Sequence, residues 1–234
     1  NNEDDKESPR DEGGNPHARK KDDEKDYAVP LLSEKRKEDK KPEEKTEKTF
    51  EHSYVDVNAD DWFHDAVAFV TENELMNGTG GDMFSPHAET TRGMIVTILY
   101  RLENEPSISQ DNIYGDVENH MYYNDAITWA STEGIVQGYD DFNFGPDDAV
   151  TREQIATMLY RFAAYKGYDV SARTDVAPFI DSQQISGYAE EAMSWAIAEG
   201  LVQGHEDGRL DPQGLATRAQ IATILQRYIT TVVR

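Results

Sequence analysis

Three arginines follow a threonine in the same local setting along this chain. Thr91-Arg92, Thr151-Arg152 and Thr217-Arg218 each precede an aliphatic run, and the arginines are 60 and then 66 residues apart. A guanidinium group presents a planar fork of N–H donors that matches a planar anion such as a carboxylate. At the first turn of a helix, free backbone N–H groups and the helix dipole also favour an anion. The alternative for each arginine is an ion pair with one of the protein's own carboxylates, which is the commoner fate of surface arginines.

The sequence around these arginines is repeated. The 36 residues that begin at Asp125 align without a gap with those that begin at Glu191, and 17 of them are identical. The unit that begins at Asp65 is more diverged. Such self-similarity predicts an array of three units, and we place them at residues 50–108, 109–170 and 171–234.

Each unit is predicted to contain two helices. The first begins near Asp65, Asp125 or Glu191 and ends at a corner where Gly134 and Gly200 suit a left-handed cap. Glu74 occupies that corner in the first unit, where the same backbone geometry costs more. At helical spacing among alanines, Trp129, Trp195 and Phe69 are predicted to be core residues.

The second helix of each unit is predicted to begin at the threonine. Gln154 and Gln220 complete capping boxes with Thr151 and Thr217, whereas Met94 leaves the cap at Thr91 half formed. Proline biases the residue before it toward extended geometry, which is expected in three segments upstream of these helices: Phe84-Ser85-Pro86, Phe144-Gly145-Pro146 and Leu210-Asp211-Pro212. A pair of short helices cannot bury its apolar stripe alone, so we expect a mainly α fold of three helix-pair repeats. The repeats are expected to be arranged with pseudo-threefold symmetry around a central three-helix bundle.

Composition divides the chain into two parts. Residues 1–49 carry 16 acidic and 13 basic residues and few apolar ones, which predicts a disordered charged linker. Residues 50–234 carry 30 acidic and 10 basic residues, a net charge of 10 − 30 = −20. That charge disfavours nucleic acid or an anionic membrane as the main partner, and no segment is apolar enough to predict membrane insertion. Because the chain does not begin with Met, we expect that it is a mature product or the C-terminal piece of a longer protein, with a possible upstream cargo domain.

Signals for an enzyme are weak. Asp56-Val57-Asn58-Ala59-Asp60 resembles the start of a calcium loop, but the sixth and twelfth positions are Asp61 and Val67 and not the required Gly and Glu. The absence of cysteine excludes disulfides, thiolate chemistry and Cys-based zinc sites. The six histidines lack metal-ligand spacing, and nothing singles out two carboxylates for glycoside hydrolysis. We therefore predict no catalytic residues, no metal and no cofactor.

A family resemblance adds to this interpretation. The run Tyr54-Val55-Asp56-Val57, Trp62, Gly78, Phe84-Ser85-Pro86 and Thr91-Arg92 resembles a surface-layer homology repeat of bacterial cell-surface proteins, and the other two units match in register. Three tandem copies form the usual complete module. The resemblance implies an extracellular, non-covalent anchor that binds secondary cell-wall polysaccharide in grooves between neighbouring repeats. It also implies that the arginine of the Thr-Arg motif binds the carboxylate of a pyruvate-ketal sugar.

Twelve positions are then candidate ligand contacts. The arginines would bind the anion, aromatic faces would stack on a sugar ring, and the aspartates would accept from hydroxyls or orient the arginines, while the glycines are first of all backbone devices. The twelve candidate positions are Arg92, Arg152, Arg218, Trp62, Tyr122, Tyr188, Asp56, Asp116, Asp181, Gly78, Gly138 and Gly204.

The chain departs from the family pattern in several places. Met94, Gln154 and Gln220 replace the usual Glu, Gly93 replaces Ala, and Tyr122 and Tyr188 replace Trp. Complete capping boxes predict that Arg152 and Arg218 matter more than Arg92. Two rival functions stay open: a protein-contact module within a surface lattice, and the C-terminal anchor of an exoenzyme such as a glycoside hydrolase.

Overall fold

The computed structural model describes residues 54–233, and the predicted linker at residues 1–49 lies outside them. Within the described range the protein is helical, and its β pairing is limited to isolated bridges. The mainly α class is thereby confirmed. The α-helices are α2 (His64–Glu72), α3 (Arg92–Leu102), α4 (Asn124–Thr132), α5 (Arg152–Tyr165), α6 (Glu190–Ala198) and α7 (Arg218–Thr231), and the 3-10 helices are η2 (Ser182–Gln184) and η3 (Gly187–Ala189).

The helix termini follow the predicted signals. The first helix of each unit begins one residue before the predicted position, and the second begins directly after its threonine cap. Thr151 and Thr217 form complete capping boxes with Gln154 and Gln220, whereas Thr91 only accepts a hydrogen bond from the Met94 N–H. The corner residue after each outer helix has a left-handed backbone conformation. After α4, α6 and α2 these residues are Gly134 with φ 72°, Gly200 with φ 71° and Glu74 with φ 58°.

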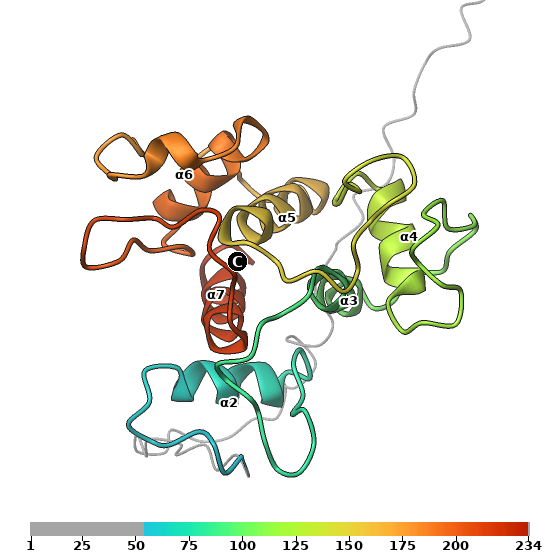
Figure 1. Cartoon of the computed structure of the whole chain (residues 1–234), viewed down its shortest axis with the longest axis horizontal. Coiled ribbons are helices and arrows are strands. Elements are labelled where there is room, and N and C mark those ends of the chain that lie inside the picture. The colour runs from blue at the N-terminus through green and yellow to red at the C-terminus, as the bar shows by residue number, and fades with distance from the viewer. Residues whose placement is uncertain (1–53, 234) are drawn as a thin grey trace, which may run out of the picture.

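The helices pack across repeat boundaries. Figure 1 shows α3, α5 and α7 at the centre, with α2, α4 and α6 outside them. The close helix pairs are α3 with α4, α5 with α6 and α7 with α2, so each central helix packs on the outer helix of the next repeat in cyclic order. The two helices of one sequence repeat are therefore not the two helices that pack closely against each other.

A closed ring of backbone hydrogen bonds joins the three repeats just before the central helices. The Val150 N–H donates to the Thr90 carbonyl, the Ala216 N–H to the Val150 carbonyl, and the Thr90 N–H to the Ala216 carbonyl, at 2.8, 2.9 and 3.1 Å. All three residues are buried. The same contact therefore recurs once in each repeat, in cyclic order.

One hydrophobic core runs through all three repeats. Trp129 and Trp195 are buried in it as predicted, and Phe69 is half-buried against it. The central helices meet through side chains, as in the Phe162 and Tyr228 rings, whose centroids are 6.2 Å apart. Near the C-terminal ends of α5 and α3, Lys166 Nζ lies 2.7 Å from Glu103 Oε2 in a largely buried ion pair.

The prediction of extended geometry before each proline is wrong. Ser85, Gly145 and Asp211 have φ values of 58°, 72° and 52°, in the left-handed region. The physical reason is a carboxylate from the start of the same repeat. In the first repeat, the Asp56 oxygens accept the N–H groups of both Phe84 and Ser85 at 2.8 and 2.7 Å, which requires these two groups to point the same way.

Candidate functional site

The three arginines of the Thr-Arg motif lie at the first position of α3, α5 and α7, and each reaches into the next repeat in the cyclic order. Every Nε and one Nη donates to a main-chain carbonyl there. The partners are Phe144 and Gln137 for Arg92 (3.0 and 2.8 Å), Leu210 and Gln203 for Arg152 (both 2.8 Å), and Phe84 and Asn77 for Arg218 (2.8 and 2.6 Å).

These contacts hold each guanidinium without neutralising it. Within residues 54–233 none of the three arginines has a carboxylate at ion-pair distance. Their exposed fractions are only 4, 6 and 7%, and this burial lowers the pKa of all three against the opposing effect of nearby acidic groups. The internal ion pair considered from the sequence is therefore not what these arginines form.

The expectation of free backbone N–H groups at the helix starts is wrong. The Arg92 and Gly93 N–H groups donate to the Asp148 and Pro146 carbonyls of the next repeat at 2.9 and 2.8 Å, and the same pattern recurs at the starts of α5 and α7. The threonine cap takes the third N–H of each helix. Since these donors are satisfied, an anion at these positions would have to contact the guanidinium groups.

The aspartates hold the loops to which the arginines bind. Asp56, Asp116 and Asp181 each accept two consecutive N–H groups of the segment before the proline, at 2.7 to 3.0 Å. The carbonyl of the first of those residues is the one that accepts from an arginine Nε. Burial would raise the pKa of Asp56 and Asp181, but these hydrogen bonds outweigh it and keep both below the ordinary value. Each aspartate therefore orients an arginine through one peptide unit.

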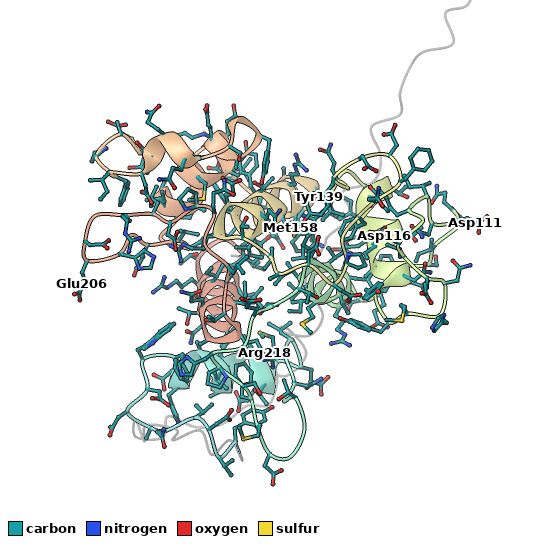
Figure 2. All side chains as sticks on the ribbon, in the orientation of Figure 1. Asp111, Asp116, Tyr139, Met158, Glu206 and Arg218 are labelled. Atoms are coloured by element: carbon teal, nitrogen blue, oxygen red, sulfur yellow. The ribbon has the colours of Figure 1, made fainter. Side chains whose placement is uncertain are left out.

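A cavity of about 420 Å³ is lined in part by Arg92, and we call it the Arg92 groove. Its walls include Gly138 and Tyr139 from the second repeat and Tyr188 from the third. Figure 2 places Tyr139 close to Met158 of α5, which lines the same cavity. The guanidinium carbon of Arg92 lies 4.6 Å from the Tyr139 ring centroid.

A smaller cavity of about 120 Å³ adjoins Arg218, and we call it the Arg218 groove. It is lined by Asn77 from the first repeat and Tyr122 from the second, and Figure 2 shows Arg218 between α7 and α2. Both grooves therefore combine residues from all three repeats, which the sequence did not reveal. The Gln203 carbonyl accepts from Arg152, and by the same cyclic order we expect Trp62 and Gly204 to lie beside Arg152.

The candidate aromatic residues are exposed. Trp62, Tyr122 and Tyr188 have exposed fractions of 67, 56 and 54%, although the next residue in each case is buried. Large aromatic rings left open to water beside a fixed cation are suited to contact a ligand with apolar faces.

The three candidate glycines are sites of close approach. An added Cβ would lie 2.5 Å from Tyr114 Cε1 at Gly138 and 2.5 Å from Phe179 Cε1 at Gly204. At Gly78 it would lie 2.7 Å from Tyr54 Cε1. None of these glycines has positive φ, so each is required by the adjacent ring and not by its backbone angles.

Some groove residues were missed from the sequence. Glu153 is 1% exposed and accepts from the Tyr188 hydroxyl and the Ser186 N–H at 2.9 and 3.0 Å. Burial of the Tyr188 hydroxyl and its hydrogen bond to the Glu153 carboxylate raise the pKa of Tyr188. Arg161 and Tyr139 also line the groove. The identical spacing of Arg161 from Arg152 and of Arg101 from Arg92 was the available signal, whereas Glu153 and Tyr139 are not repeated in the other units.

Residues 54–233 contain neither a candidate membrane span nor a candidate metal site. No helix there is both long and apolar enough to cross a bilayer. Nor does any cluster of three or more His, Cys, Asp or Glu side chains have the arrangement needed to hold a metal ion.

Comparison with known proteins identifies the repeat. The family model of the S-layer homology domain matches residues 53–93, 113–156 and 178–222. An endoglucanase of Bacillus sp. (strain KSM-635) is 30% identical over 179 residues, which cover 76% of this chain and 19% of that protein. A cellulosome-anchoring protein of Acetivibrio thermocellus is 26% identical over 160 residues, or 66% of this chain and 35% of that protein.

A surface-layer 125 kDa protein of Lysinibacillus sphaericus is 25% identical over 174 residues, or 72% of this chain and 14% of that protein. The chain thus spans about a third or less of the length of these relatives. The three matched segments together cover more than half of the chain, each containing one of the three Thr-Arg motifs. The chain belongs to the S-layer homology domain family.

Proposed function

We propose that this chain is a non-covalent anchoring module that binds secondary cell-wall polysaccharide in the grooves between its repeats. Family membership and the surface-layer and cell-surface names of several relatives indicate an extracellular location at the cell surface. The finer part of the proposal is that the Thr-Arg guanidinium binds the carboxylate of a pyruvate-ketal sugar.

One observation carries this proposal. Each guanidinium is fixed by two carbonyl acceptors, yet it has no carboxylate partner in the described part of the chain. A fixed cation without a counter-ion, beside exposed aromatic rings, complements a carboxylate carried on a sugar ring.

Binding of wall polymer to arginine variants of the full 234-residue chain tests the proposal. Arg92→Lys, Arg152→Lys and Arg218→Lys keep the charge but lose the planar fork, and each is expected to reduce retention of pyruvylated polymer. Depyruvylated polymer is the control and should be retained weakly by every form. Because the arginines also bind buried carbonyls, thermal melts must show that each variant is folded. Equal retention of the two polymers by the unaltered chain would overturn the ketal assignment.

The capping boxes predict that Arg152 and Arg218 matter more than Arg92. The structure gives no support to that order, because the guanidinium contacts are the same at all three positions. Of the two grooves described above, the one at Arg92 has the larger volume. Polymer retention by the three lysine variants, measured side by side, shows whether Arg92 or the pair Arg152 and Arg218 contributes more to binding.

The similarity to an endoglucanase favours a second proposal, that the module anchors an enzyme encoded in the same polypeptide. We propose that the module itself binds the polymer without cleaving it. Release of reducing ends from wall polymer by the purified chain would contradict this. The lattice alternative is tested with wall sacculi before and after the polysaccharide is stripped: retention after stripping would support protein contacts.

A further inference from the structure

A second set of arginines accompanies the first. Arg101, Arg161 and Arg227 each lie nine residues after an arginine of the Thr-Arg motif. Together the two sets supply six of the ten basic residues in residues 50–234, in a region that has 30 acidic ones.

The spacing places the two arginines of each helix on opposite sides. At about 100° per residue, nine residues correspond to about two and a half turns of an α-helix. A central helix therefore gives its first arginine to one groove and its second to the other. In agreement, Arg161 of α5 lines the groove of Arg92, and Arg101 of α3 lines the groove of Arg218.

The Arg161 guanidinium has no protein partner within the described residues. It is half-buried and lines the Arg92 groove, yet within residues 54–233 it makes no hydrogen bond or ion pair. Glu153 is the acidic residue that lines this groove, and its two oxygens are engaged by Tyr188 and Ser186. Two guanidinium groups thus line one cavity, and the hydrogen bonds of its Glu153 carboxylate come from Tyr188 and Ser186 and not from either arginine.

We infer that the Arg92 groove binds two anionic groups of the wall polymer, one at Arg92 and a second, on a neighbouring sugar, at Arg161. This rests on the proposed function and adds to it the class of ligand: a saccharide with two acidic substituents. Two guanidinium groups that line one cavity are best satisfied by two anions, since a single carboxylate in bidentate contact with Arg92 leaves Arg161 without a charged partner.

The corresponding pair at Arg152 differs. There the Arg227 Nη2 donates to Gln203 Oε1 at 3.3 Å, and the Gln203 carbonyl accepts from Arg152 at 2.8 Å. Arg227 also donates to the Leu201 carbonyl at 3.4 Å. Because Arg227 is engaged internally, the two-anion assignment does not extend to Arg152 and Arg227.

The test compares three synthetic ligands by titration calorimetry on the full chain. They are a pyruvylated N-acetylhexosamine, the same sugar linked to a neutral hexose, and the same sugar linked to a hexuronic acid. Arg161→Gln is expected to weaken binding of the diacid by about tenfold or more, the size of a lost charge-assisted hydrogen bond. The two monoacids are expected to change less than about twofold.

Arg209→Gln is the matched control, because it makes the same charge change at an exposed loop position that pairs with Asp207 outside the groove. It should leave all three affinities unchanged. Arg161→Lys retains the charge and should restore part of the diacid preference.

The outcomes separate the two proposals. If Arg92→Lys abolishes binding while Arg161→Gln leaves the diacid affinity unchanged, the two-anion inference is overturned and the proposed function stands. Equal weakening of all three ligands by Arg161→Gln also overturns the inference, because it indicates a structural or long-range effect. If Arg92→Lys affects no ligand, the Arg92 groove is not a binding site and the inference is overturned. The proposed function fails only if Arg152→Lys and Arg218→Lys also leave the binding of every ligand unchanged.

Discussion

Each motif arginine is held by two main-chain oxygens, and the loop that carries one of them is held in turn by an aspartate. The Asp181 carboxylate accepts from the Leu210 and Asp211 N–H groups, and the Leu210 carbonyl accepts from Arg152. A buried carboxylate fixed in this way positions the cation at the groove without contacting it. The residue types were predictable from the sequence, but this indirect linkage was not.

Asp181→Asn is expected to destabilise the protein by about 1–3 kcal/mol at neutral pH, because one of two charge-assisted hydrogen bonds to backbone N–H is lost. The pKa of Asp181 is lowered in the folded state. Its stabilising effect is therefore complete above the unfolded pKa of about 3.9 and is lost as the pH falls toward the folded pKa. Denaturant unfolding between neutral pH and pH ~3 measures this, and the difference between the two proteins should shrink below about pH 4.

The control for this prediction is Asp207→Asn. Asp207 pairs with Arg209 on an exposed loop, so its loss should have little effect on stability. The difference in unfolding free energy between Asp181→Asn and the unaltered chain could instead stay constant down to pH ~3. That result would contradict the assignment of the stabilisation to the ionised Asp181 carboxylate.

At the scale of the element, the segment four residues after each corner contains a glycine in close contact with an aromatic ring. Gly138→Ala would place a methyl group 2.5 Å from Tyr114 Cε1 and 2.6 Å from the Asn143 carbonyl oxygen. We expect a loss of about 1–3 kcal/mol in unfolding free energy, because a methyl group must be forced into packed atoms. Chemical denaturation measures it.

Gly187→Ala is the matched control, because an added Cβ there meets nothing within 4 Å and its φ is not positive. It should change stability by less than about 0.5 kcal/mol. Similar losses in both variants would show that helix or turn propensity, and not the approach to Tyr114, explains the glycine.

The elements were predicted better than their contacts. Capping residues and corner glycines are local signals, so the helix starts were predicted within one residue and the incomplete cap at Thr91 was predicted correctly. The geometry before each proline was not predictable, because it is imposed by an aspartate 29 or 30 residues earlier. The contacts of Arg218 with Asn77 and Phe84, 141 and 134 residues away, are beyond any local pattern.

At the scale of the whole molecule, the cyclic packing makes the three repeats interdependent. Helix α2 packs on α7, so the first and last repeats hold each other. A fragment that ends at residue 170 lacks α7 and exposes the buried face of α2, including Val67 and Val70. Exposure costs about 1.5–3 kcal/mol for each such side chain. We expect this fragment to lack a cooperative thermal transition by circular dichroism, whereas the full chain should unfold in one step. A cooperative melt of the fragment would show that the repeats are independent.

Net charge sets how the whole module meets an anionic polymer. Residues 50–234 carry a net charge of −20, so the approach of an acidic polysaccharide is opposed at long range and binding rests on close contacts at half-buried and buried arginines. Raising the salt from about 0.01 to about 0.15 M shortens the screening length from about 30 to about 8 Å, which weakens the long-range repulsion more than the buried contacts. We therefore expect the affinity for pyruvylated polymer to stay constant or to rise over this range, and titrations at four salt concentrations measure it. Depyruvylated polymer provides the baseline at each concentration. A steep fall in affinity with added salt would instead indicate attraction through dispersed surface charge, which the acidic surface of this module does not provide.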